Sequence, residues 1–368
     1  MHAHKKQNGD KGRVSAMARR KFAGTLLGAA LAMAAGLPQA AAQQKAGIAP
    51  EASYTGADRQ QKLMEGAKKE GELLIYTSAT VEDMQALAAA FEKKYGIKAK
   101  VWRAGGEKVS QRVVAEGRAG RYAVDIIETD GIELEAQHRE GMLQPVVSPY
   151  QAELIPQAIQ KHGEWTGTRL NIFAMAYNTN QVKKEDLPKT YQDLLDPKWK
   201  GKLGIEAEDV DWFGGVVEEL GEEKGLQLFR DIVAKNGLSV RKGHTLLTNL
   251  VASGEVPLSL TVYNYKAEQL KNKGAPIDWF TISPAIARAN GVAMAKGAPH
   301  PNAAVLFFDF MLSDGQQILL ERDIVPTSTK AQTKLNKMPL KFVDPKLVLD
   351  ESAKWSNLYE EIITKQSK

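Results

Sequence analysis

The sequence predicts an α/β protein made of two lobes, each a doubly wound sheet, with a ligand cleft between them. The main observation is that strand-like and helix-like patterns alternate through one stretch of the chain and then through a second. Composition agrees, because 368 residues with 43% hydrophobic and 25% charged positions are typical of a globular protein long enough for two domains. We assign 57–176 plus 284–328 to lobe one and 177–283 to lobe two.

The first stretch alternates strand and helix three times. In order it contains the strand GELLIYT, a helix with an apolar face at Met84, Leu87, Ala88 and Phe91, the strand IKAKVW, a helix from Glu107 to Glu116, the strand AVDII and a helix from Ile132 to Arg139. Gly96 follows the first helix, in the position where glycine commonly ends a helix. The second stretch contains the strands KLGIEAE, LSV, VPLSLTVY and IDWFTI, with helices after the first two. In such sheets ligands bind beyond the carboxyl ends of the strands.

The first 42 residues predict an export signal. They carry seven basic residues and one acidic residue, and MARRKFAG precedes the apolar run GTLLGAALAMAAGL and a small-residue cleavage site after Ala42. Sec and twin-arginine export both remain open, as do starts at Met1 and Met17. We therefore expect a periplasmic protein with a flexible N-terminus over 43–56 and a helical C-terminal segment over 329–368.

Charge and motifs exclude several classes of function. The whole chain is formally +5, but the part after the leader is −1, which gives no basic surplus for nucleic acid. There is no cysteine, so thiolate metal sites, cysteine nucleophiles and a lipid anchor are excluded. Nucleotide-binding glycine motifs, G-x-S-x-G and H-E-x-x-H are absent. We expect no enzyme and no cofactor, with a secreted enzyme as the remaining alternative, and we interpret the mature chain's histidines as surface or capping residues.

Three segments resemble one family. LPKTYQDLLDPKWKGKL, HPNAAVLFFDFMLSDGQQILLERDIVPTSTK and GELLIYTSATVEDMQALAAAFEKKYGIK resemble bacterial extracellular solute-binding proteins grouped with the ferric-ion-type receptors of ABC importers. The resemblance covers about residues 70–330. It implies the two-lobed periplasmic-binding-protein fold (type II-like), closing on ligand by hinge bending. It also implies a monomer whose partners are a small solute and the membrane permease of an ABC importer.

Candidate ligand contacts in lobe one follow its three predicted strands: Thr77, Ser78, Arg103, Gly105, Glu107 and Thr129. Hydroxyls and amides at helix starts can hold an anion, and an arginine can pair with a carboxylate or phosphate. Each has a structural alternative. Thr80 with Asp83 forms a capping box, Asp130 caps the helix that follows it, and Arg103 is a solvated arginine beside a turn.

In lobe two the candidates are Glu206, Asp211 and Tyr263, with Ser283 on the return to lobe one. Glu206 and Asp211 belong to an acidic run, EAEDVDW, which is alternatively the capped start of a helix. Tyr263 ends an alternating strand and faces the cleft. Tyr265 joins it only if the strand continues, whereas Asn264 as a helix cap turns Tyr265 away.

The sequence is compatible with two kinds of ligand. The preferred ligand is a small organic anion, namely a carboxylate, phosphonate or phosphate ester. The alternative is a ferric ion held by Tyr263, Tyr265 and Glu206, because the family's ferric receptors use adjacent tyrosines near this place. Here Asn264 separates the tyrosines, and the opening loop YTSATVED has no histidine.

Overall fold

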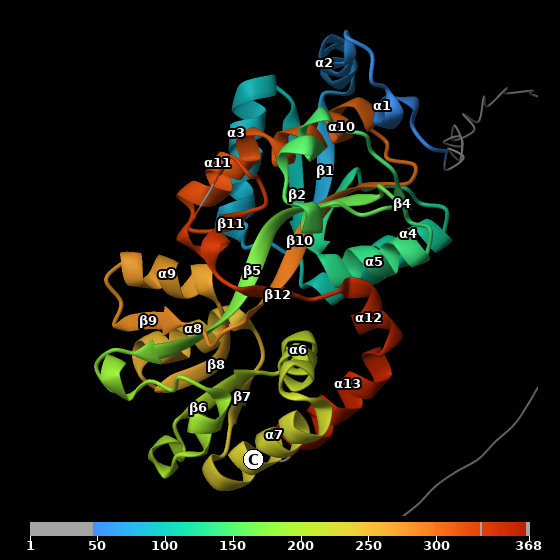
Figure 1. Cartoon of the computed structure of the whole chain (residues 1–368). Helices are drawn as coiled ribbons and strands as arrows, with labels where there is room; N and C mark the ends of the chain where they lie inside the picture. The colour runs from blue at the N-terminus through green and yellow to red at the C-terminus, as the bar shows by residue number, and fades with distance from the viewer. Residues whose placement is uncertain (1–46, 332, 366–368) are drawn as a thin grey trace, which may run out of the picture. The chain divides into compact units, whose positions relative to one another are not determined.

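The structure, a computed structural model, describes residues 47–331 and 333–365. The predicted export signal over 1–42 lies outside the described residues. The strands follow one path, in the order β2-β1-β3-β10-β5-β8-β6-β7, with β4 and β12 added at β10 and with β9 and β11 added at β5 (Figure 1). The pairing falls into one sheet for each lobe, as the sequence predicts.

Lobe one contains the strands β1 (Glu72–Thr77), β2 (Lys98–Arg103), β3 (Ile126–Asp130), β4 (Leu143–Gln144), β10 (Ala285–Ala295) and β11 (Val325–Pro326). Its α-helices are α1 (Pro50–Ser53), α2 (Arg59–Glu70), α3 (Val81–Tyr95), α4 (Gly106–Arg118), α5 (Gly131–Arg139), α10 (Pro301–Leu312) and α11 (Asp314–Glu321). Lobe two contains β6 (Leu203–Glu206), β7 (Ser239–Arg241), β8 (Leu258–Tyr263), β9 (Ile277–Phe280), α6 (Val210–Leu220), α7 (Glu222–Asn236), α8 (His244–Ser253) and α9 (Asn264–Asn272).

The remaining elements connect or follow the lobes. They are β5 (Trp165–Asn178), β12 (Leu340–Phe342), α12 (Pro345–Asp350), α13 (Ser352–Tyr359) and a π-helical turn, Glu360–Thr364. Short 3-10 turns occupy Pro149–Glu153, Pro156–Ala158, Lys184–Asp186, Tyr191–Leu195, Pro197–Trp199 and Lys334–Lys337. The segment over 329–368, predicted to be helical, therefore also contributes the strand β12, which pairs with β10.

The strand β5 runs through both sheets. Ile172 pairs with Ala287 of β10 in lobe one, and the next residue, Phe173, pairs with Tyr263 of β8 in lobe two. All fourteen residues of β5 are buried. The chain therefore crosses between the lobes within a continuous strand.

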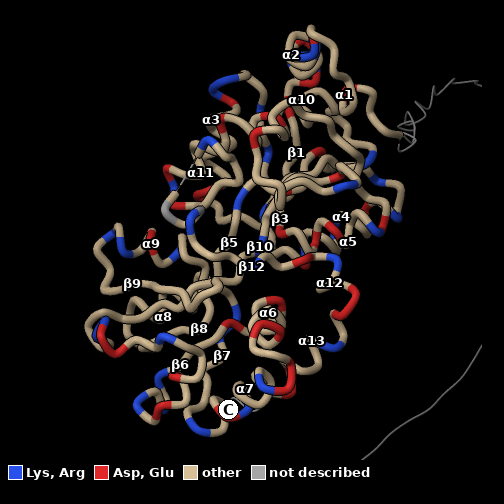
Figure 2. Tube along the Cα trace, viewed as in Figure 1, with Lys and Arg blue, Asp and Glu red and all other residues tan. Residues whose placement is uncertain are grey.

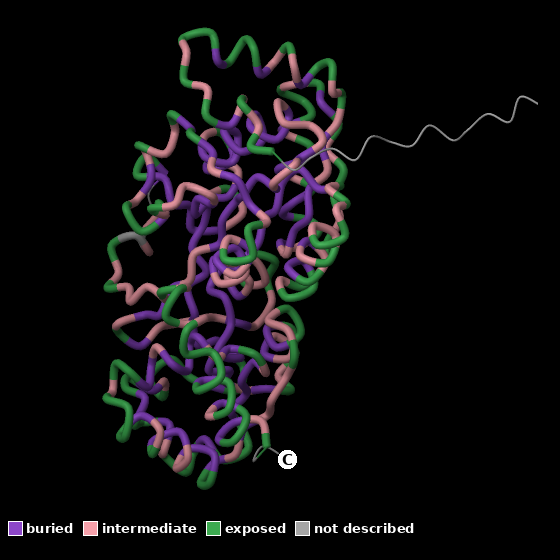
Figure 3. The backbone as a smooth tube through the Cα atoms, turned by 90° about the vertical axis from the view of Figure 1, so that its right-hand side faces the viewer, coloured by how far each residue is buried: buried purple, intermediate pink, exposed green. Residues whose placement is uncertain are grey.

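The core of lobe one is built on α10, in which every residue from Ala303 to Leu312 is buried. Its Phe307 and Phe310 meet Phe91 of α3 at ring-centroid distances of 5.1 and 5.6 Å. Figure 3 shows buried residues concentrated in the central strands and exposed residues on the outer turns. Among the described residues no single helix is long and apolar enough to cross a membrane, and α10 with α11 reaches that length only as a pair bent by 52°.

Local sequence signals explain several helix ends. Thr80 accepts a hydrogen bond from the amide of Asp83 at the start of α3, and Gly96 ends that helix at φ 71°. Both features were predicted. The start of the described chain differs from the expected flexible N-terminus, because α1 buries Ala52 and its carbonyl accepts from the amide of Val147 at 2.8 Å.

Candidate functional site

The carboxyl ends of the strands in the two lobes face each other across the β5 and β10 crossing. In lobe one, β1, β2 and β3 are parallel, so their ends lie at one edge and lead into α3, α4 and α5. In lobe two, β6, β7 and β8 are parallel in the same way and lead into α6, α8 and α9. Six helix N-termini therefore gather between the lobes, which is where α/β sheets bind ligands.

Tyr263 lies at the centre of this region. Its hydroxyl is hydrogen-bonded to the guanidinium of Arg288 on β10, and that guanidinium also donates from Nη1 to Asp211 Oδ2 at 3.0 Å. Burial raises the pKa of Tyr263 well above its usual value, and the charge of Arg288 opposes this effect. Burial likewise raises the pKa of Asp211, again against the effect of Arg288. Lobe two is thus joined to β10 by charged and polar contacts.

His244 and Asp209 lie beside Tyr263. The His244 ring stacks on the Tyr263 ring at a centroid distance of 3.7 Å, and its Nε2 lies 3.1 Å from Asp209 Oδ1. Asp209, which with Asp211 is one of the two residues of the acidic run that could cap this helix, occupies the N-cap position of α6, but its side chain makes no capping hydrogen bond. A carboxylate that leaves its cap unmade and turns to a histidine is unusual, because N-cap acids normally satisfy helix amides.

Glu206 is hydrogen-bonded to the residues that immediately precede Asp209 and His244. Its Oε1 accepts from the amide of Gly243 at 2.7 Å, and its Oε2 accepts from the amide of Glu208 at 2.5 Å. Burial, and next the charge of Asp209, raise the pKa of this carboxyl. Both oxygens accept from backbone amides, so Glu206 orders two loops, and its carboxylate also lies within 4.8 Å of ligand atoms of Asp209 and His244.

The region between the lobes concentrates polar atoms that have no hydrogen-bond partner. Among the described residues, eight buried side-chain atoms lack a partner, and five of them gather here: Thr129 Oγ1, Asp209 Oδ2, His244 Nδ1, Asn264 Oδ1 and Arg288 Nε. Buried polar groups are nearly always satisfied. A cluster of such groups at one place is therefore suited to bind a polar or charged solute.

Acidic groups outnumber basic ones in this cluster. Asp209, Asp211 and Glu206 come from lobe two, and the charge of Asp130 in lobe one acts on Arg288. Figure 2 shows acidic positions around α6 and along the α12–α13 segment. Buried like charges repel strongly. The cluster therefore favours a cationic partner over an anionic one.

Glu133 gives a pH prediction for the lobe-one side. Burial, and then the charge of Asp130, raise its pKa from 4.5 to about 7. A carboxyl with a raised pKa binds its proton more tightly in the folded state, so its contribution to stability is complete below pH 4.5 and is lost as pH rises through about 7. We expect Glu133→Gln to flatten that decline in unfolding experiments across pH 4–8, whereas Glu65→Gln, at an exposed position on α2, should retain it. Equal slopes for wild type and Glu133→Gln would contradict this assignment.

The predicted lobe-one contacts are placed differently from one another. Thr77 is fully buried and donates to Glu128 Oε2 at 2.5 Å, because the register of β1 and β3 puts these residues side by side. Thr129 is fully buried with an unpartnered hydroxyl, and Ser78 is half-buried. Arg103 is exposed and donates from Nε to the carbonyl of Ala79 at 3.1 Å. Gly105 is the exposed N-cap of α4, and Glu107 is exposed beside it.

The predicted contacts Tyr263, Tyr265 and Ser283 also lie in different surroundings. The β8 strand ends at Tyr263, which is itself the N-cap of α9, so the prediction that Asn264 is the cap is wrong by one residue. Tyr265 lies in a different environment from Tyr263. Burial raises the pKa of Tyr265 to about 12, and the charge of Arg169 opposes this effect. The two tyrosine rings are parallel with centroids 6.0 Å apart. Ser283 is exposed at the crossing into β10.

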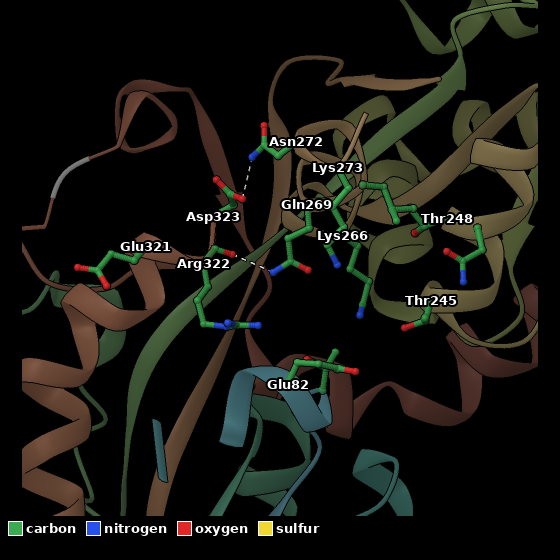
Figure 4. Close-up of a pocket in the computed structure, with 13 residues that line it drawn as sticks. Glu82, Thr245, Thr248, Lys266, Gln269, Asn272, Lys273, Glu321, Arg322 and Asp323 are labelled. Carbon is green, nitrogen blue, oxygen red and sulfur yellow. Dashed lines mark hydrogen bonds between the residues drawn. The ribbon is translucent and has the colours of Figure 1, made fainter. Parts of the chain in front are cut away.

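An open cavity of about 410 Å³ lies next to the polar cluster. Its lining comes from α3 and α11 of lobe one and from α8 and α9 of lobe two: Thr80, Glu82, Glu321, Arg322, Asp323, Thr245, Thr248, Asn249, Lys266, Gln269, Leu270, Asn272 and Lys273. Figure 4 shows Lys266 and Arg322 extending into it from opposite sides. Burial is the main reason that the pKa of Lys266 falls to about 8. The lobes touch at its rim, where Gln269 donates to the carbonyl of Arg322 at 2.9 Å.

Three residues of the cluster were missed by sequence reasoning. Asp209 was considered only as a cap, Arg288 was not singled out, and His244 was interpreted as a surface or capping residue. His244 is in fact largely buried at the first position of α8. A signal was available, because His244 comes shortly after the strand LSV and directly after Gly243, on the side of the sheet where ligands bind.

Comparison with known proteins gives a consistent family assignment. The model of the family described as "Bacterial extracellular solute-binding protein" matches residues 77–318, more than half of the chain. "Iron uptake protein A1" of Synechocystis sp. is 26% identical over 287 residues, which is 74% of this chain and 79% of that protein.

Two solved structures share the fold. Iron-bound HitA from Pseudomonas aeruginosa aligns with a TM-score of 0.69 at 23% identity, over 79% of this chain and 99% of that one. The periplasmic binding protein AfuA from Actinobacillus pleuropneumoniae, with fructose-6-phosphate bound, aligns with a TM-score of 0.71 at 24% identity, over 80% and 99%. The predicted two-lobed periplasmic-binding-protein fold is confirmed, and the chain belongs to the bacterial extracellular solute-binding protein family.

Proposed function

We propose that this chain is the periplasmic receptor of an ABC importer, which captures one small solute between its lobes and presents it to a membrane permease. The family match supports this role, and so does the gathering of six helix N-termini between the lobes. We further propose that it works as a monomer and by binding alone. The contacts of Arg288 with Asp211 and of His244 with Asp209 pair no serine, cysteine or lysine nucleophile with a base.

For the solute, we propose a ferric ion ahead of a small organic anion. The observation that carries this choice is the pair of buried, unpartnered donors, Asp209 Oδ2 and His244 Nδ1, on side chains that lie beside the ring of Tyr263. Imidazole, carboxylate and phenolate are suitable ligands for iron. A further acid, Asp211, lies on the other side of Arg288 and adds to the negative charge. An anion entering here would meet several buried carboxylates, which is the reason that we reverse the order of preference drawn from sequence.

The residues proposed for iron also differ from the sequence prediction. Tyr263 is kept, while Asp209 and His244 take the places given to Glu206 and Tyr265. Both carboxylate oxygens of Glu206 already accept from backbone amides, and Tyr265 lies within the electrostatic influence of Arg169. Several relatives support iron as the solute by name, among them the Synechocystis iron uptake protein and a ferric iron-binding protein of Neisseria meningitidis.

A small organic anion remains the second candidate because of one specific observation. The 410 Å³ cavity is large enough for a metabolite, and Lys266 points into it without an ion-pair partner among the described residues. In this alternative Lys266 and Arg322 would hold the anion, with Thr80 and Thr245 as hydroxyl partners. The predicted contacts Thr77 and Ser78 would then act through the loop that precedes Thr80.

One experiment separates these candidates. Protein purified from its own periplasm is examined by native mass spectrometry with parallel metal analysis, and apoprotein is then titrated with ferric citrate and with a panel of carboxylates, phosphonates and phosphate esters. We expect one iron per chain and a tyrosinate charge-transfer absorption. An organic mass without iron would establish the second candidate. Turnover of a bound metabolite would overturn both and favour an enzyme.

A further inference from the structure

The C-terminal strap, which we define as residues 340–365, contacts both lobes. It begins with β12, which pairs with Ala285–Ala287 of β10. Its helix α12 then packs against α5 of lobe one. Arg139 of α5 donates from Nη1 to Asp350 Oδ1 at 2.7 Å and from Nη2 to the carbonyl of Lys346 at 3.3 Å. One end of the strap is therefore fixed to lobe one.

The other end of the strap is fixed to lobe two by apolar packing. Trp355 of α13 covers Gly214 of α6, where an added Cβ atom would lie 3.2 Å from the indole ring. Tyr359 meets Phe213 of α6 edge to face at a centroid distance of 5.4 Å. Ile362 and Ile363 are fully buried at the π-helical turn beside α7. Figure 1 shows the strap passing from α5 to α6 and α7 along one side of the molecule.

The strap also reaches the loops that carry the candidate iron donors. The buried hydroxyl of Tyr359 donates to the carbonyl of Glu206. The Glu206 carboxylate accepts from the amides of Glu208 and Gly243, which immediately precede Asp209 and His244. A chain of three hydrogen bonds therefore runs from the strap to both donor-bearing segments.

The strap and the open cavity lie at different sides of the region between the lobes. The cavity is bounded by α3, α8, α9 and α11, while the strap contacts α5, α6 and α7. At the cavity the lobes touch through two hydrogen bonds, Gln269 to the carbonyl of Arg322 and Asn272 to Asp323 (Figure 4). Separation of the lobes thus breaks few contacts on the cavity side and many on the strap side.

We propose that the C-terminal strap is a third connection between the lobes, which limits their separation on the α5–α6 side, and that Tyr359 is a positioning residue for Asp209 and His244. The lobes then open towards the α9–α11 side, so solute enters through the cavity. The positioning role rests on the proposed function, whereas the limit on opening does not depend on which solute binds.

The limit on opening is tested by making the strap longer. Four Gly/Ser residues are inserted between Asp350 and Glu351, which leaves both anchors intact and adds about 10 Å of reach. The chain has no cysteine, so Lys93→Cys on α3 and Lys235→Cys on α7 provide unique spin-label positions on exposed helix faces. We expect the ligand-free distance distribution to broaden and shift to longer values by up to about 10 Å.

The matched control is the same insertion between Gly120 and Arg121, at a turn inside lobe one. It should leave the interlobe distances as they are in the parent. If the strap insertion and the control give the same distribution, the strap does not limit opening and the proposal is overturned. This outcome is independent of iron.

The positioning role is tested with Tyr359→Phe, which keeps the ring packing and removes one hydrogen bond. We expect ferric citrate to bind about threefold to tenfold more weakly, as for the loss of one hydrogen bond, with a shifted charge-transfer absorption and unchanged interlobe distances. Wild-type affinity and absorption in this variant would overturn the role. If wild-type protein itself fails to bind ferric citrate, the iron function fails, and the distance experiment still decides on the strap.

Discussion

Replacement of Arg169 by methionine is expected to lower the free energy of unfolding by about 3–5 kcal/mol. Arg169 on β5 donates from Nε and Nη2 to Glu128 Oε1 on β3, at 3.2 and 2.7 Å, and both side chains are buried. Removal of the arginine leaves the Glu128 carboxylate buried with Thr77 as its remaining side-chain partner. An uncompensated buried charge is the reason for the large effect.

Chemical denaturation of wild type and variant measures this loss. Lys94→Met is a matched control, because Lys94 forms an ion pair with Asp314 at 2.5 Å in which both side chains are about half exposed. It should cost less than about 1 kcal/mol. The double variant Arg169→Met with Glu128→Leu should recover much of the stability, since apolar replacement of a buried pair is often neutral. A small loss for Arg169→Met alone would show that Glu128 is reached by water.

The substitution Asp209→Asn is expected to weaken ferric citrate binding by about 100-fold or more, because it removes a buried charged partner of the ion. The same change should leave the ligand-free protein equally stable or more stable. Asp209 holds one buried oxygen without a partner beside other carboxylates, so neutralising it relieves repulsion and desolvation. Opposite signs for affinity and stability are the signature of a residue kept for binding.

Isothermal titration and thermal unfolding measure the two quantities in parallel. Glu208→Gln is the control, since Glu208 is one residue away but exposed and paired with Lys242. It should change affinity by less than about twofold, as expected for a surface ion pair. If Asp209→Asn bound ferric citrate as tightly as wild type, the cluster around Tyr263 would not be the iron site, and the cavity at Lys266 would become the place to examine.

The sequence was sufficient for the elements that depend on local signals. The Thr80 cap and Gly96 end define α3, and Asp130 caps α5 through the amide of Glu133 at 3.1 Å. The same alternation of strands and helices predicted two lobes and a region between them. Caps and helix ends depend on neighbours within four residues, and the alternation follows the order of the chain, so both can be recognised from sequence.

The candidate site depends on contacts that sequence order does not contain. Arg288 meets Tyr263 and Asp211, which lie 25 and 77 positions away along the chain. Thr77 has the strand-end position of a ligand contact, yet the register of β1 against β3 turns it towards Glu128. A free side chain and a satisfied one look alike in sequence, and strand register decides between them.

The place of β10 has a consequence for the order in which the protein folds. This strand lies between β3 and β5 in the lobe-one sheet, but it follows all of lobe two in the chain. Lobe two, apart from the strap that covers it, is formed by one continuous stretch and can pair its strands as soon as that stretch is available. The sheet of lobe one lacks a middle strand until β10 has been added. Its pairing with β3 joins segments that are far apart in the chain, and such non-local strand pairing is slow.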